Sequence, residues 1–240
     1  MGHRIGIITA TYQRHRFLPA VLRQVRQQTY QAWNFVLCND GPDPEARRLF
    51  EQHSRGDARM QYIETAKPTR NWGGTPRTLG LRTLAVQNPP DYVVLWDDDN
   101  EFHPTALESI ASALVQHHEP ELLLVPFIVG DRLVPRADFN IATARGGEVD
   151  TGNFVVKFAR ALEHYPAAIA PDGGRGEDFA FFKLLRERPD VRIAMAQGEP
   201  IGRYDGLRPL QKLRWRLNIP ALGIAETRWY GPVRQWLRRS

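Results

Sequence analysis

The segment that most constrains the fold runs from Val93 to Asn100, where four apolar residues lead directly into three adjacent aspartates and an asparagine. Two of the apolar residues are β-branched and the run follows a proline-containing turn at residues 88–91, as is typical of an interior strand in a parallel sheet. Adjacent carboxylates repel one another and resist desolvation, so such a strand end needs solvent or a cation. Oxygen ligands favour a hard divalent ion, Mg2+ or Mn2+, over zinc.

A solvated acidic turn is the alternative interpretation of this segment, because acidic residues are common in turns. Further strands are predicted at residues 4–9, 33–38 and 60–64, with helices at 17–28, 44–53, 75–86 and from about 104 to 118. This alternation predicts an α/β fold with an open, mostly parallel sheet and helices on both faces.

The loops after the strands supply the other polar residues of the predicted site. Right-handed crossovers bring these loops to the carboxyl edge of the sheet, where open α/β sheets bind ligands. That edge collects Thr11, Tyr12, Asp40 and the three aspartates at residues 97–99. Their convergence favours a binding site over a solvated turn.

The second half of the chain is less regular. Glycines and prolines interrupt residues 130–153, which lead into an apolar run at 154–156, and we expect strands and loops in this region that form the second wall of a cleft. A glycine-rich segment at residues 171–176 leads into a helix predicted from Asp178 to about Arg188. Glu177 and Asp178 fall in its first turn, where the helix dipole favours negative charge, so helix capping explains one acidic residue there about as well as catalysis does.

Length and composition predict one folded domain. A chain of 240 residues with 42% hydrophobic residues can bury a sizeable core. Its longest apolar run, at residues 122–129, is far shorter than the roughly 20 residues that cross a bilayer. The N-terminus lacks the pattern of a signal peptide, and the single cysteine, Cys38, forms no internal disulfide. These features predict a cytoplasmic protein.

The positive charge is concentrated at the C-terminus. The net charge is +5, but residues 203–240 contain nine basic and two acidic residues, so the rest of the chain carries −2. This distribution argues against nucleic acid as a partner. Residues 206–240 mix Leu and Trp with Arg, which predicts a basic amphipathic segment in peripheral contact with an anionic membrane. In a cytoplasmic protein this contact would be with the inner face of the membrane. Alternatively, its apolar side chains pack back on the domain.

Five short motifs together resemble the family-2 glycosyltransferases of the GT-A fold, which are inverting enzymes that use nucleotide-sugar donors. The motifs lie at residues 8–14 (ITATYQR), 39–41 (NDG), 71–78 (NWGGTPRT), 97–99 (DDD) and 176–178 (GED). The resemblance covers about residues 4–205. It implies a single GT-A domain at residues 1–205, with a nucleotide-binding half at 1–100 and an acceptor half at 101–205. It also implies transfer from a UDP- or dTDP-sugar to a saccharide, lipid-linked or other hydroxyl acceptor.

The resemblance implies a role for each matching residue. Asp178 would be the general base, and Asp99 would hold Mn2+ or Mg2+. The residues that would contact the donor nucleotide are Ala10, Thr11 and Tyr12 at the nucleoside, Asp40 at the base, Arg77, and Asp97 and Asp98 at the ribose or diphosphate. Asn153 and Glu177 are candidate acceptor contacts.

The sequence departs from the family pattern in one place that concerns the metal. Many relatives supply a histidine ligand after the Glu-Asp helix, but the last histidine here is His164, before that helix. Asp205 stands near the expected position and is the candidate replacement.

Two other functions remain as alternatives. A nucleotidyltransferase also uses a nucleotide and a metal, but it usually has a glycine-rich first loop, and residues 9–14 contain no glycine. A non-catalytic nucleotide-sugar-binding module would keep the fold, although the presence of both Asp99 and Asp178 makes it less favoured. An EF-hand-like calcium loop does not fit, because adjacent carboxylates lack its alternating ligand spacing.

Overall fold

The computed structural model of the chain describes residues 2–169 and 176–204. The candidate ligand Asp205 and the basic segment at residues 206–240 lie outside the described residues. The elements in chain order are β1 (Ile5–Thr11), α1 (Leu18–Arg26), β2 (Trp33–Asn39), α2 (Pro44–Ser54), β3 (Met60–Glu64), α3 (Gly74–Gln87), β4 (Tyr92–Leu95), β5 (Glu101–Phe102), α4 (Ala106–Gln116), β6 (Leu122–Leu124), β7 (Phe127–Val129), β8 (Arg132–Val134), η1 (Thr151–Asn153), β9 (Phe154–Lys157), α5 (Phe158–Ala168), α6 (Glu177–Arg186), β10 (Ile193–Met195) and β11 (Gly202–Arg203).

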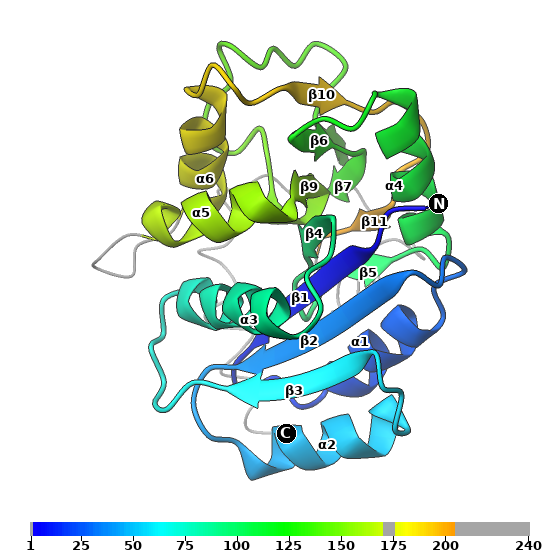
Figure 1. Cartoon of the computed structure of the whole chain (residues 1–240), viewed down its shortest axis with the longest axis vertical. Helices are drawn as coiled ribbons and strands as arrows, with labels where there is room; N and C mark the ends of the chain where they lie inside the picture. Colours follow the sequence, from blue (N-terminus) through cyan, green and yellow to red (C-terminus); the bar gives the residue numbers. More distant parts are fainter. Residues whose placement is uncertain (1, 170–175, 205–240) are drawn as a thin grey trace.

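The main sheet has seven strands in the order β10-β6-β9-β4-β1-β2-β3 (Figure 1). Strand β1 pairs in parallel with β2 and β4, and β2 pairs in parallel with β3. Strand β9 is antiparallel to both of its neighbours, β4 and β6. The prediction of an open, mostly parallel α/β sheet is therefore confirmed.

Helices cover both faces of this sheet, as predicted. Helices α1, α2 and α4 bury their apolar sides in one core, and α3, α5 and α6 bury theirs in a second core on the other face (Figure 1). In α1 the buried residues Leu18, Val21, Leu22 and Val25 follow the spacing of one helical face. Burying both faces explains why the central strands are nearly continuous apolar runs.

The apolar run at residues 122–129 is divided between two sheets. Strand β6 ends at Leu124 in the main sheet, and β7 begins at Phe127 in a four-stranded sheet with the order β5-β11-β7-β8. Pro126 lies between them and has no N–H to donate to a ladder, which favours a change of strand there. Its carbonyl accepts a hydrogen bond from the N–H of Ile201, 2.8 Å away.

The sequence analysis predicted no element for residues 158–168. They form α5, which packs against α3 and α6. The helix was hidden in the sequence because Pro166 lies inside it, and an internal proline removes a backbone hydrogen bond. The apolar run at residues 154–156 is part of β9 and completes the main sheet rather than a separate wall.

Helix α6 begins one residue earlier than expected, at Glu177, and ends at Arg186. Gly176 precedes it with φ of 101°, a conformation that favours glycine. Within the two described ranges, no helix combines the length and hydropathy that crossing a bilayer requires.

Candidate functional site

Strands β1, β2 and β4 end next to one another, so the predicted residues do meet at one edge of the sheet. Thr11 lies opposite Asn39 in the ladder, and Ile8 lies opposite Leu95, two residues before the acidic turn. Trp96 is buried and stacks on Phe102 with ring centroids 3.9 Å apart. This stacking anchors the turn that carries Asp97, Asp98 and Asp99.

Two of the three aspartates are buried around one guanidinium. Arg14 Nη1 donates to Asp98 Oδ1 at 2.6 Å and to Asp99 Oδ2 at 2.7 Å, and Thr11 Oγ1 donates to Asp98 Oδ2 at 2.6 Å. Asp98 is only 2% exposed. Burial raises the pKa of Asp98 to about 6, with Arg14 opposing and Asp99 adding to the shift. Both Asp98 oxygens accept hydrogen bonds inside the protein. The Asp98 carboxylate therefore has no exposed edge for the expected contact with ribose or diphosphate.

Arg77 links the acidic turn to the start of α6. Its guanidinium is buried, and Nη2 forms an ion pair with Asp97. Nη1 donates to Glu177 Oε1 at 3.1 Å and to the Tyr165 hydroxyl at 3.3 Å. The pKa of Arg77 is raised because Tyr165, Asp97 and Glu177 together outweigh the effect of burial. The sequence analysis expected Arg77 to contact the nucleotide. In this arrangement its guanidinium instead joins the two sides of the site.

Asp178, the predicted base, lies in the first turn of α6 beside this link. Its Oδ1 accepts a hydrogen bond from the N–H of Phe179 at 2.6 Å. Burial raises its pKa, Asp97 adds to the shift, and Arg77 opposes it. The preceding residue, Glu177, pairs with Arg77, which also pairs with Asp97, so the first turn of α6 lies beside the acidic turn. The partner Glu177 is held by Arg77, which gives it a positioning role as well as the expected acceptor contact.

Asp150 is a further carboxyl group of this site that the sequence analysis missed. Its Oδ1 accepts from the N–H of Gly152 at 2.8 Å, and burial together with the charges of Asp97 and Asp178 raises its pKa to about 7. In the sequence, Asp150 was indistinguishable from an ordinary turn residue. The only available signal was its spacing from Asn153, which is that of a helix cap.

The acceptor contact expected of Asn153 is not supported by its position. Asn153 is completely buried, and its Oδ1 accepts from the N–H of Asp150 at 3.3 Å. Its side chain closes the cap of η1 and offers no surface to an acceptor. Asn153 therefore holds Asp150 in place.

Asp40, the predicted base contact, organises the neighbouring loop. Its Oδ1 accepts from the N–H and hydroxyl of Thr69, both at 2.8 Å, and its Oδ2 accepts from the N–H of Arg70 at 2.7 Å. That loop carries Trp72, which is 52% exposed. The loop also packs on the end of β1, because a Cβ added at Gly73 would lie 2.9 Å from the Cβ of Ala10.

The loop after β1 places the two remaining nucleoside candidates differently. Thr11, the last residue of β1, is buried and its hydroxyl donates a hydrogen bond to Asp98. Tyr12, the first residue of the loop, is half-buried and therefore partly accessible. Tyr12 is thus the better placed of the two for contact with a ligand.

The acidic turn fits a divalent ion that a ligand helps to coordinate. Within the described part of the chain, no group of three or more His, Cys, Asp or Glu residues could hold a metal. Mg2+ and similar ions are commonly bound by one or two carboxylates together with phosphate oxygens and water. Asp97 and Asp99 supply such oxygens, so the residues present fit a metal shared with a diphosphate.

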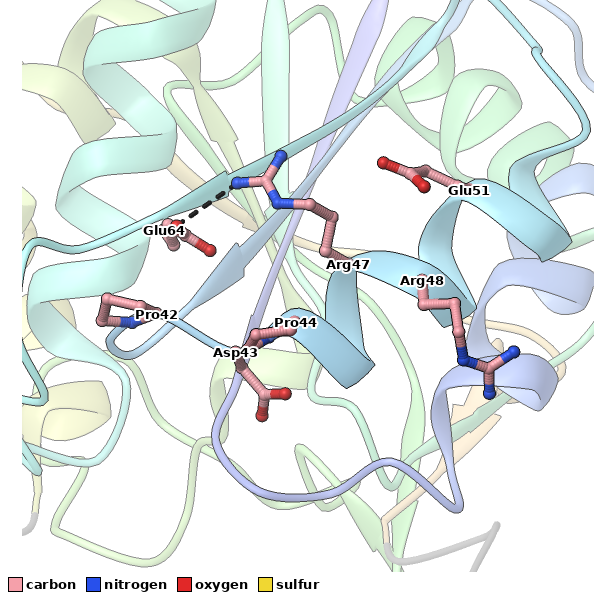
Figure 2. Close-up of a pocket in the computed structure, with 7 residues that line it drawn as sticks. All are labelled: Pro42, Asp43, Pro44, Arg47, Arg48, Glu51 and Glu64. Atoms are coloured by element: carbon pink, nitrogen blue, oxygen red, sulfur yellow. Dashed lines mark ion pairs between the residues drawn. The ribbon is translucent and has the colours of Figure 1, made fainter.

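A separate hollow of about 270 Å³ lies beside the start of α2 (Figure 2). It is lined by Pro42, Asp43, Pro44, Arg47, Arg48, Glu51 and Glu64. Arg47 and Glu64 face each other across it in an ion pair of 3.3 Å. None of the predicted site residues lines this hollow.

Comparison with known sequences covers four of the five motifs, all but the one at residues 176–178. The family model described as Glycosyl transferase family 2 matches residues 6–129. Protein CgeD of Bacillus subtilis (strain 168) is 27% identical over 124 residues. The CgeD match covers 50% of this chain but only 28% of CgeD, so most of that relative has no counterpart in the match.

Comparison with solved structures shows the fold. The crystal structure of S. aureus TarS 1-349 in complex with UDP has a TM-score of 0.67 at 15% identity, and the match covers 93% of this chain and 68% of TarS 1-349. Mannosyltransferase PcManGT from Pyrobaculum calidifontis, in complex with GDP-Man and Mn2+, has a TM-score of 0.59 at 15% identity. That match covers 90% of this chain and 61% of PcManGT.

Proposed function

This chain belongs to glycosyl transferase family 2, and we propose that it moves a sugar from a nucleoside diphosphate sugar to a hydroxyl acceptor with inversion at the anomeric carbon. The observation that carries the proposal is the buried link from Asp97 through Arg77 to Glu177. It sets the acidic turn after β4 and the first turn of α6 in one site, although they are about eighty residues apart in the sequence.

Asp178 is the proposed general base. The acceptor hydroxyl must lose a proton as its oxygen attacks the anomeric carbon, and a positioned carboxylate that accepts this proton is typically worth ~10²–10⁴-fold in rate. The raised pKa of Asp178, which is caused mainly by burial, makes its carboxylate a stronger proton acceptor than an exposed aspartate. Glu177 and Arg77 fix the helix turn from which Asp178 acts.

Asp99 and Asp97 are proposed to face the leaving nucleoside diphosphate. A divalent ion, Mn2+ or Mg2+, bound at Asp99 would stabilise the negative charge that develops on the diphosphate as the glycosidic bond breaks. Asp97 is kept in place by Arg77, and Asp99 by Arg14. Tyr12 and the loop that Asp40 organises lie at the same sheet edge and are proposed to receive the nucleoside.

The donor is proposed to be a UDP- or dTDP-sugar, and the acceptor a saccharide, lipid-linked or other hydroxyl compound. Residues 1–205 are proposed to form one domain, in which residues 1–100 bind the nucleotide and residues 101–205 bind the acceptor. The matched TarS structure contains UDP and the PcManGT structure contains GDP-Man, so both bases are included in the test.

The test is a thermal-shift panel of UDP-, dTDP-, GDP- and CMP-sugars with and without Mn2+, followed by product analysis. A ligand that binds only the folded state raises the free energy of unfolding, by about 2.7 kcal/mol when the ligand concentration is one hundred times Kd. The thermal midpoint rises accordingly. We expect the largest shift from a UDP- or dTDP-sugar together with Mn2+, and release of the nucleoside diphosphate upon turnover. Formation of a nucleoside triphosphate and a sugar 1-phosphate from the nucleotide sugar and added pyrophosphate would instead identify a nucleotidyltransferase, and binding without turnover would identify a non-catalytic module.

A further inference from the structure

Arg14 lies in the loop after β1, and its guanidinium contacts two adjacent buried carboxylates. Its side chain is 39% exposed, whereas the side chains of Asp98 and Asp99 are 3% and 4% exposed. A single nitrogen, Nη1, lies within 2.7 Å of an oxygen of each carboxylate. The positive charge of Arg14 therefore offsets the repulsion between two carboxylates that have been removed from water.

Asp98 and Asp99 both accept a hydrogen bond from Arg14 Nη1. Asp98 is also held by Thr11 Oγ1 at 2.6 Å, so its position is fixed from two directions. Asp99 presents Oδ2 to Arg14, and Asp99 is the carboxylate proposed to hold the divalent ion. Arg14 thus neutralises the carboxylate that the ion would bind.

We infer that Arg14 is the resident counter-cation of the metal site, and that a divalent ion must displace it from the Asp99 carboxylate while Arg14 remains paired with Asp98. The inference rests on the proposed function. A guanidinium has no lone pair available for a metal and stays charged, so it cannot join the coordination shell and instead competes with the ion for the same carboxylate.

This exchange has a consequence for the order of binding. With Arg14 in place, the acidic pocket is already compensated, and the free protein has a weak affinity for the ion. A donor diphosphate brings further negative charge and additional oxygen ligands, which favour the ion over the guanidinium. The ion and the donor are therefore expected to bind together rather than in sequence.

The test is the binding of Mn2+ alone to the donor-free protein, measured from the electron paramagnetic resonance signal of free Mn2+. Arg14→Gln keeps a hydrogen-bond donor for Asp98 but removes the charge, and we expect it to bind Mn2+ at least about fivefold more tightly than the wild type. Arg14→Lys keeps the charge and is expected to stay within about threefold of the wild type.

Arg16→Gln is the matched control. Arg16 is exposed, lies in the same loop, and stacks over the Phe17 ring at 4.6 Å. The Arg16→Gln variant loses the same charge two residues away from Arg14, so its Mn2+ affinity should stay within about twofold of the wild type. A gain in Arg16→Gln equal to that in Arg14→Gln would show a long-range charge effect and overturn the displacement.

Unchanged or weaker Mn2+ binding by Arg14→Gln also overturns the inference. If Arg14→Gln folds only when Mn2+ is present, the exchange is supported; if it fails to fold with and without Mn2+, the inference is rejected. Measurements with UDP and Mn2+ on the wild type separate the two proposals. Absence of Mn2+ binding even with UDP would remove the metal from the proposed function, whereas binding with UDP and no gain in Arg14→Gln removes only the role of Arg14.

Discussion

Substitution of Asp178 should lower the rate of sugar transfer without changing the affinity for the donor. We expect Asp178→Asn to lower kcat by ~10²–10⁴-fold, because the acceptor then has no base, while the affinity for the donor changes little. Transfer assays and calorimetric titration of the donor measure the two effects. Asp190→Asn, at an exposed carboxylate beyond the end of α6, is the control and should retain activity. Near-normal turnover by Asp178→Asn would exclude Asp178 as the base.

Asp150 should make stability depend on pH near neutrality. Burial raises its folded-state pKa from 3.8 to about 7, so the folded protein binds this proton more tightly than the unfolded chain. This group makes the wild type lose stability as the pH rises from about 4 to about 7, and Asp150→Asn lacks that contribution. Since one pKa unit corresponds to about 1.4 kcal/mol, we expect the variant to gain at least ~1 kcal/mol relative to the wild type between pH 4.5 and pH 8.

Urea unfolding of both proteins across that pH range measures the effect of Asp150→Asn. Asp138→Asn removes one negative charge at an exposed ion pair with Arg136 and is the matched control. A stability difference between Asp150→Asn and the wild type that stays constant with pH would show that Asp150 does not titrate in this way.

The motifs predicted which residues gather at the sheet edge, but not how they pair. Strand ends converge for a general reason, the shared direction of crossovers, so Asp40 and Asp97 could be placed from the sequence. The pairing of Arg77 with Glu177 joins residues one hundred positions apart, and no local pattern encodes such a contact. Asp98 was assigned to the ribose or diphosphate because the sequence does not show which of the three carboxylates are buried.

At the scale of elements, Arg77 connects α3, the end of β4 and the start of α6. Removing one partner of a buried ion pair leaves the others uncompensated and typically costs about 3–5 kcal/mol. We therefore expect Arg77→Met to lower the free energy of unfolding by about that amount in urea titrations. Arg82→Met, at an exposed position of the same helix, should change it by less than about 0.5 kcal/mol. Equal effects in the two variants would contradict a bracing role for Arg77.

The elements of the first half were easier to predict than those of the second. Each strand from β1 to β4 is followed by a helix or a turn with a clear start signal, such as Asp43 and Pro44 at α2. Helix α5 and strand β9 lack such signals: α5 has no side-chain cap and contains Pro166, and β9 follows its capped turn without a gap. Their places depend on long-range packing, which a local pattern does not contain.

At the scale of the whole molecule, residues 206–240 are proposed to bind an anionic membrane; this segment lies outside the described residues. Near such a surface each Lys or Arg contributes about 1 kcal/mol. Replacing Arg228, Arg234, Arg238 and Arg239 by Gln should therefore abolish co-sedimentation with anionic vesicles. The wild type on zwitterionic vesicles is the control. Undiminished binding of the Gln variant to anionic vesicles would favour packing of the segment on the domain.

The position of β9 has a consequence for how this chain can be made. The family match ends at residue 129, yet the outer edge of β4 is paired by β9, at Phe154–Lys157, and β6 joins the sheet only through β9 on that side. A nascent chain leaving the ribosome therefore carries an unpaired, wholly apolar β4 edge until residue 157 has emerged. A version cut at residue 129 would keep that edge open permanently, and exposed edges of this kind seed aggregation.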